Sequence, residues 1–104
     1  MLISMTKLET DRPLTGALES LDLATGKISS LFLRCRPYGV AVSRVAPEIF
    51  VTCALDGVVL AIDAAQMVVY EWFRVGGAPR RIAVSADGRS ILVANQLGRV
   101  DLIR

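Results

Sequence analysis

Three glycines at a constant interval constrain the fold of this chain more than any other feature. Gly16, Gly57 and Gly98 are evenly spaced, and each opens a stretch of alternating or clustered apolar residues. Residues 16–22 read GALESLD, and residues 57–63 read GVVLAID. A regular spacing of about 40 residues is the mark of an internal structural repeat.

A second set of positions repeats at an interval that is one residue longer. Pro37, Ala41, Val42, Ser43, Ile49 and Val51 recur as Pro79, Ala83, Val84, Ser85, Ile91 and Val93. The difference between the two intervals is one residue of loop length, which surface connections tolerate. A repeat of roughly 40 residues made of short strands is typical of a β-propeller blade, a four-stranded antiparallel sheet.

The alternation of apolar and polar residues predicts strands throughout and no helix. We expect ten of them, at residues 2–6, 17–23, 27–33, 38–43, 48–54, 58–63, 67–74, 81–85, 90–95 and 99–103. The fold class is therefore all-β, with two and a half four-stranded blades. Residues 1–15 are expected to be a partial strand and loop of a preceding blade, and residues 16–104 to hold the repeats, with blade breaks near 36 and 78.

Turn residues differ between the copies. The run from Asp22 to Gly26 offers a carboxylate that caps backbone N–H groups and a glycine that reaches positive φ, and Asp87-Gly88 closes a hairpin in the same manner. In the middle copy Gln66 is taken to stand where Gly26 stands, and Ala46-Pro47 replaces Asp87-Gly88. These hairpins need a different turn, or strain of about 1 kcal/mol.

Several segments resemble the YVTN β-propeller repeats. Residues 50–53 (FVTC) and 92–95 (LVAN) look like the Tyr-Val-Thr-Asn signature of that family, and residues 75–89 (VGGAPRRIAVSADGR) resemble a longer motif of its repeat. The resemblance runs from about Gly16 to the C-terminus. Cys53 stands where the signature has Asn, and Arg104 stands where Asp22 and Asp63 end the earlier copies.

The resemblance implies a fold without an attached active site. Propellers of this family serve as cell-surface proteins, lactonase-like enzymes and dehydrogenase-type cofactor domains. Exported members are common, so a parent protein in the periplasm or at the cell surface is compatible with the sequence, and the compartment stays open.

Composition excludes several classes of protein. A hydrophobic content of 53% with 21% charged residues excludes disorder. No apolar run approaches the roughly 20 residues of a membrane helix, and residues 1–11 lack the pattern of a signal peptide. The net charge of +2 does not predict a nucleic-acid surface.

Catalytic groups are scarce in the sequence. There is no His and no Gly-rich phosphate loop, and two separate cysteines cannot build a four-ligand zinc site. We expect Cys35 and Cys53 to be buried or half-buried thiols, with a disulfide as the less favoured alternative. Among the carboxylates of Asp22, Asp63, Asp87 and Asp101, three lie at hairpin turns or strand ends, so a structural role as caps of backbone donors is favoured over calcium binding or proton transfer. No catalytic residue, metal ligand or cofactor is predicted.

One group of basic residues supports a binding hypothesis. In a blade whose strands run outward in order, the return connection to the next innermost strand lies on one face of the disc. Five arginines fall in or beside these connections: Arg34, Arg36, Arg74, Arg80 and Arg81. In a full ring they would form a collar suited to carboxylates or phosphates, and the alternative is that they only keep the protein soluble. Tyr38 and Trp72 offer possible stacking surfaces, but we expect Trp72 to pack between blades.

An array of two and a half blades leaves two apolar faces uncovered. The expected partners are therefore missing blades or identical copies, besides a protein or a small anion. The first hypothesis for function is a non-enzymatic interaction or scaffold module, either a fragment of a longer propeller or a self-assembling part-propeller. The alternative is part of a propeller enzyme whose catalytic residues lie on other blades.

Overall fold

The computed structural model describes residues 2–7 and 16–104, which form ten β-strands. The strands are β1 (Leu2–Lys7), β2 (Gly16–Leu21), β3 (Ile28–Leu33), β4 (Pro37–Val42), β5 (Glu48–Cys53), β6 (Val58–Asp63), β7 (Val68–Arg74), β8 (Pro79–Val84), β9 (Ile91–Asn95) and β10 (Arg99–Ile103). All ten expected strands are present, with ends shifted by a few residues at most. No helix occurs among these residues.

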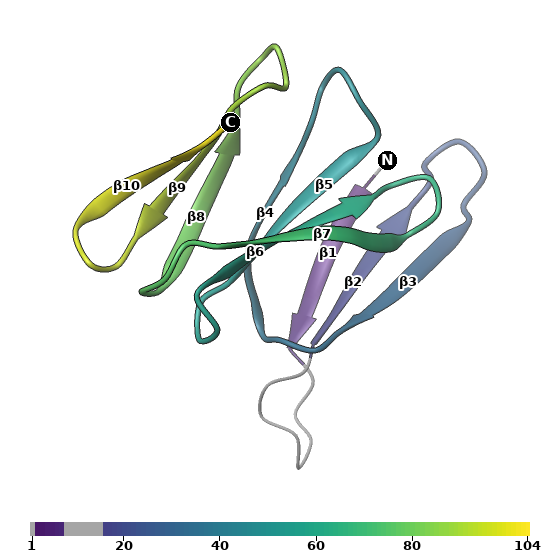
Figure 1. Ribbon diagram of the computed structural model, residues 1–104. Coiled ribbons are helices and arrows are strands. Elements are labelled where there is room, and N and C mark those ends of the chain that lie inside the picture. The colour runs from purple at the N-terminus through teal and green to yellow at the C-terminus, as the bar shows by residue number, and fades with distance from the viewer. Residues whose placement is uncertain (1, 8–15) are drawn as a thin grey trace.

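The strands form three antiparallel sheets that fan out side by side (Figure 1). Their orders are β1-β2-β3, β4-β5-β6-β7 and β8-β9-β10, and we refer to them as the first, middle and third blades. Strands β4 and β8, which begin the middle and third blades, contact each other, and β1 contacts β4. We call β4 and β8 the innermost strands. The all-β propeller architecture predicted from the repeat is confirmed.

Strand pairing reproduces the sequence repeat in detail. In the middle blade Pro37 pairs with Cys53, and the register then shifts before Val40 pairs with Val51. In the third blade Pro79 pairs with Asn95, and the same shift precedes the next pair. Both innermost strands therefore carry an irregularity directly after a proline, at equivalent positions of the repeat.

The changes of sheet fall at residues 34–36 and 75–78. Strand β1 pairs along its length with β2, so it lies in the same sheet as β2 and β3. The loop expected within residues 8–15 lies outside the described residues. The division of the chain at residue 15 stays a prediction.

Two apolar clusters fill the spaces between the blades. The first lies between the first and middle blades and contains Leu18, Leu33, Ile49, Val51 and Ile62, with both cysteines and Met67. The second lies between the middle and third blades and is built from Phe50, Val59, Ala61, Ile91 and Val93. Successive residues of β5 and β6 thus alternate between the two clusters, as the period of two requires.

The aspartate caps of the turns are confirmed. Asp22 Oδ1 accepts the Ala24 N–H at 2.9 Å, and Asp63 Oδ1 accepts the Ala65 N–H at 2.8 Å. Asp87 Oδ1 accepts the Arg89 N–H at 3.0 Å in the third blade. In each turn the carboxylate stabilises the local backbone by accepting the N–H of the residue two positions further along the chain.

The residue equivalent to Gly26 is Met67, so the assignment of that place to Gln66 was wrong. The N–H of Gly26 bonds to the Asp22 carbonyl and that of Met67 to the Asp63 carbonyl, both at 2.7 Å. Met67 has a φ of 54°, close in kind to the 76° of Gly26. A non-glycine residue in this region costs about 1 kcal/mol, and the side chain of Met67 is buried in the first cluster, which offsets that cost.

The turn that contains Ala46-Pro47 differs from its counterpart, as expected. No residue between Ser43 and Glu48 has positive φ, and the loop closes through the Ser43 N–H and the Glu48 carbonyl at 3.0 Å. In the third blade Gly88 has a φ of 73°. A side chain at Gly88 would collide with Val45, so the two loops lie against each other.

Among the residues the structure describes, none forms a helix with the length and apolarity needed to cross a membrane.

Candidate interaction surfaces

We call the face of the third blade that points away from the middle blade its rear face. This face is exposed, although the equivalent face of the middle blade is buried. Phe50, Thr52, Val59 and Ala61 of the middle blade are covered by the third blade. Their equivalents are Leu92, Ala94, Val100 and Leu102. Of these, Leu92 is 47% exposed, Val100 67% and Leu102 48%. The third blade thus exposes a face whose equivalent on the middle blade is covered by a neighbouring blade.

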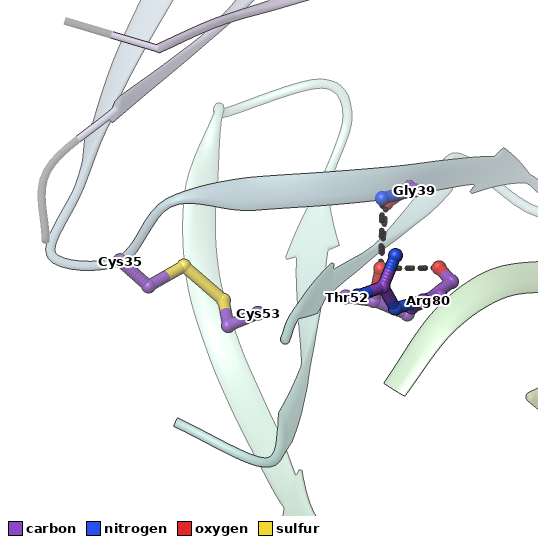
Figure 2. Close-up of a disulfide and its surroundings, with 5 residues drawn as sticks. All are labelled: Cys35, Gly39, Thr52, Cys53 and Arg80. Carbon is purple, nitrogen blue, oxygen red and sulfur yellow. Dashed lines mark hydrogen bonds between the residues drawn. A yellow bond between two sulfur atoms is a disulfide. The ribbon is translucent and has the colours of Figure 1, made fainter. Parts of the chain in front are cut away.

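The innermost strands meet at a three-residue contact (Figure 2). The Thr52 hydroxyl accepts the Gly39 N–H at 2.7 Å and donates to the Arg80 carbonyl at 2.6 Å. A Cβ on Gly39 would collide with that carbonyl. A glycine in β4 therefore lets the backbone of β8 approach, and one buried hydroxyl joins the two blades.

In the third blade a single side chain secures the connection that enters the innermost strand. Asn95 Nδ2 donates to the Gly76 carbonyl at 2.9 Å, and Asn95 Oδ1 accepts the Ala78 N–H at 3.2 Å. Its oxygen also accepts the Leu97 N–H at 3.1 Å, and its nitrogen reaches Asp101 at 3.1 Å. We call this arrangement the asparagine clamp. It explains why the last position of the four-residue stretch 92–95 is polar and buried.

In the middle blade a disulfide holds the corresponding connection. Cys35 and Cys53 are bonded, with their Cα atoms 5.8 Å apart (Figure 2). The expectation of two thiols is therefore wrong. Cys53 is the equivalent of Asn95 and Cys35 that of Gly77, so strand pairing brings the two cysteines together.

The structure distributes the five arginines over separate places. Arg34 lines a groove between the first and middle blades, Arg74 a groove between the middle and third blades, and Arg81 a pocket on the rear face of the third blade. Arg36 lies in the connection before β4, and its Nε is buried without a hydrogen-bond partner among the described residues. A collar requires a complete ring, so the anion-binding role of these residues stays a prediction.

Arg80 already has partners within the described chain. Its guanidinium donates to Gln96 Oε1 at 2.7 and 3.1 Å and stacks on the Tyr38 ring, 5.0 Å from the centroid. Trp72 is 57% exposed and lies beside Arg74, whose guanidinium is 5.7 Å from the ring. The expectation that Trp72 packs between blades is wrong. Its neighbour Phe73 packs there instead, because successive side chains of a strand point to opposite faces.

Two of the grooves between blades occupy equivalent positions of the repeat. The first, of about 510 Å³, is bordered by Phe32 of β3 and by Leu60 and Val69 of the middle blade. The second, of about 660 Å³, is bordered by Phe73, the equivalent of Phe32, and by Asp101, the equivalent of Leu60. Strand β7 walls the first groove through Val69, and no described strand takes that place beside the second.

Among the described residues, no three or more Cys, Asp or Glu side chains form a group that could hold a metal ion. Hydrogen bonds from Ser85 and from the Arg89 N–H lower the pKa of Asp87, which is the behaviour of a turn cap. Asp101 accepts from Arg99 at 2.8 Å and from Asn95, so it supports the asparagine clamp.

Comparison with known proteins identifies the fold and not a family. No protein-family model matches, and no curated protein matches in sequence. Among solved structures, hydrazine synthase of Kuenenia stuttgartiensis matches over 97% of this chain with a TM-score of 0.76 and 22% identity. This chain spans 31% of the length of that chain. The similarity establishes a shared arrangement of propeller blades.

Sequence reasoning placed the disulfide second to two thiols and missed the contact between the innermost strands. The disulfide could have been found from the repeat, because Cys53 replaces an Asn and Cys35 precedes Pro37 by the same two residues that separate Gly77 from Pro79. The role of Gly39 could not have been found that way. Only glycine fits at this position because the backbone carbonyl of Arg80, in a strand of the next blade, lies too close for a side chain.

Proposed function

We propose that this chain is a non-enzymatic propeller segment that acts as a scaffold, with blade faces that bind further blades or identical copies. The observation that carries the proposal is the exposed rear face of the third blade. The equivalent face of the middle blade is buried against the third blade, so within this chain a face with the same apolar pattern packs against another blade. Apolar faces of this kind are covered in stable repeat proteins.

The mass of the purified chain in solution tests this proposal. Sedimentation over a range of concentrations is expected to show association of the wild-type chain, and the double variant Leu92→Asp/Leu102→Asp is expected to be monomeric. Val68→Asp, on the exposed outermost strand of the middle blade, is the matched control and keeps the association. A discrete trimer or tetramer supports closure by copies, and a polydisperse sample supports a segment of a longer propeller. A wild-type chain that stays monomeric at high concentration contradicts the proposal.

The second candidate is part of a propeller enzyme whose catalytic residues lie on other blades, lactonase-like or cofactor-binding. The similarity to a portion of hydrazine synthase favours it, because that protein is named as an enzyme. The coding sequence on either side of this segment discriminates between the two. An open frame that continues the same period and adds His, Glu or Asn residues along the channel supports the enzyme, and blades without such residues support the scaffold.

A further inference from the structure

The first groove, between the first and middle blades, is walled by strands that the structure describes along their whole length. Strand β2 begins at Gly16 as β6 begins at Gly57, so β3 is the outermost strand of the first blade, as β7 is of the middle one. The lining residues lie at the ends of β3 and β5, in the connections that follow them, and in β6 and β7. Any strand added to the first blade would lie beside β1, on the opposite edge of that sheet. The groove is therefore a feature of two neighbouring blades and not a gap at the edge of a sheet.

The wall of this groove is apolar. Val58 and Leu60 of β6 pack against the first cluster and so point toward the first blade. Val69 of β7 lies on the same face, because it pairs with Ile62, which belongs to that cluster. Leu33 and the disulfide complete the apolar lining. With a volume of about 510 Å³, the groove has the size and the character of a site for a small molecule.

Two side chains of opposite charge also line the groove. Arg34 follows β3, Asp56 lies in the turn between β5 and β6, and both are exposed. Neither side chain forms a salt bridge or a hydrogen bond with another described residue, and the two do not pair with each other. The groove thus presents a cation and a carboxylate beside one apolar wall, both without a partner in the described part of the chain.

The second groove lacks this combination. Asp101 takes the place of Leu60 in its wall, and that carboxylate is already paired with Arg99 at 2.8 Å. The other charged residues of its lining, Arg74 and Arg104, are both cationic. Of the two grooves, the first alone joins an apolar wall to one available charge of each sign.

We propose that the first groove binds a small zwitterion with an apolar body, of the class of apolar dipeptides. The guanidinium of Arg34 donates parallel N–H groups to the carboxylate of the ligand, and Asp56 accepts from its ammonium group. The apolar body lies against Val58, Leu60 and Val69, which removes apolar surface from water. A ligand without one of the two charges leaves Arg34 or Asp56 beside it without a partner, which lowers affinity. The site lies within the chain, so it is independent of the proposed scaffold function, which concerns exposed faces of the blades.

Leucyl-leucine is the probe that tests this proposal. It is titrated into the isotope-labelled chain at a concentration at which sedimentation shows a monomer, so that the result does not depend on association through the rear face. We expect saturable shifts of the methyl signals of Val58, Leu60 and Val69. The methyl signals of Leu92 and Leu102, on the rear face of the third blade, should not move and serve as the internal control.

Two capped forms of the probe test the roles of its charges. N-acetyl-leucyl-leucine has no ammonium group and leucyl-leucinamide has no carboxylate, so each should bind about threefold to fivefold more weakly than the parent. Arg34→Gln should weaken binding of the two ligands that carry a carboxylate and spare leucyl-leucinamide. Asp56→Asn should weaken binding of the two ligands that carry an ammonium group and spare the acetylated form. Arg44→Gln and Glu19→Gln, which alter exposed side chains outside the lining, are the matched controls and should leave all three affinities unchanged.

Three results would overturn the proposal. The first is the absence of saturable shifts at Val58, Leu60 and Val69 up to the solubility limit of leucyl-leucine. The second is equal affinity for the three ligands, which would show that the charges do not select. The third is an affinity that depends on only one of the two charges, since such a site would not recognise a zwitterion. Because the capped ligands make this test on the wild-type chain, it does not depend on the folding of any variant.

Discussion

Cys53 and Asn95 occupy equivalent positions in successive blades, and each holds the connection that leads into the innermost strand of its own blade. One does so by a covalent bond to Cys35, the other by hydrogen bonds to Gly76 and Ala78. Two different chemistries therefore perform one structural task. Their equivalence can be tested by exchanging one for the other.

We expect that the clamp can be transplanted into the middle blade. Loss of the disulfide, which closes a separation of 18 residues, should lower the free energy of unfolding by about 3 kcal/mol. The variant Cys35→Gly/Cys53→Asn should then be more stable than Cys35→Gly/Cys53→Ala by about 1 kcal/mol or more, because the new amide can bond to the connection. Urea unfolding of the two variants measures the difference. Equal stabilities would show that the equivalence is one of position only.

Asn95→Ala should destabilise the chain. The Gly76 carbonyl and the Ala78 and Leu97 N–H groups lose their partner in a part-buried site, which costs about 2–4 kcal/mol. Thermal unfolding followed by circular dichroism measures the loss. Asp56→Ala, at an exposed turn in the middle blade, serves as the control and should change stability by less than about 0.5 kcal/mol. A similar effect of both substitutions would contradict the role assigned to Asn95.

Thr52→Val should weaken the contact between the middle and third blades. Valine keeps the shape but leaves the Gly39 N–H without its side-chain acceptor and the Arg80 carbonyl without its donor, a loss of about 1–3 kcal/mol. Amide exchange at Gly39, read by NMR, should become faster. Thr52→Ser keeps the hydroxyl, so protection at Gly39 should persist. Loss of protection in both variants would contradict the role assigned to the hydroxyl.

The free energy of unfolding should decrease at high pH because Tyr70 ionises. Partial burial, and then its hydrogen bond to Glu48 at 2.7 Å, raise the pKa of Tyr70 from 10.0 to about 12. A pKa raised by folding means that the folded chain holds this proton more tightly, so the stabilisation is complete below pH 10 and is lost as the pH rises through 12. Phenolate absorbance should report one tyrosine that ionises near pH 12. The difference in stability between wild type and Tyr70→Phe should narrow over this range, and a constant difference would exclude the effect.

The order of strands was predictable because it depends on a pattern that every copy repeats. The two repeat intervals, which differ by a single residue between the outer and the inner strands, predicted the ten strands. The turns followed as well, since an aspartate before a turn acts on neighbours two or three residues away. Local chemistry of this kind can be read without a structure.

The interaction surfaces were harder to predict because they depend on what lies across from each residue. Trp72 and Phe73 are adjacent in sequence, yet one is exposed and the other packs between blades. Only the register of β7 against β6 decides which of the two faces the neighbour. Similarly, the sequence interpretation aligned Gln66 with Gly26, one residue away from Met67, which occupies that position in the structure.

The meeting of Gly39, Thr52 and Arg80 is not repeated in the next blade. The equivalent of Gly39 is Arg81, and that of Thr52 is Ala94. A blade seated behind the third one therefore finds a long side chain where close approach needs none, and no hydroxyl with which to bond. In any ring that contains this segment, we therefore expect the step after the third blade to be wider near the axis than the step before it, with a departure from rotational symmetry at that point.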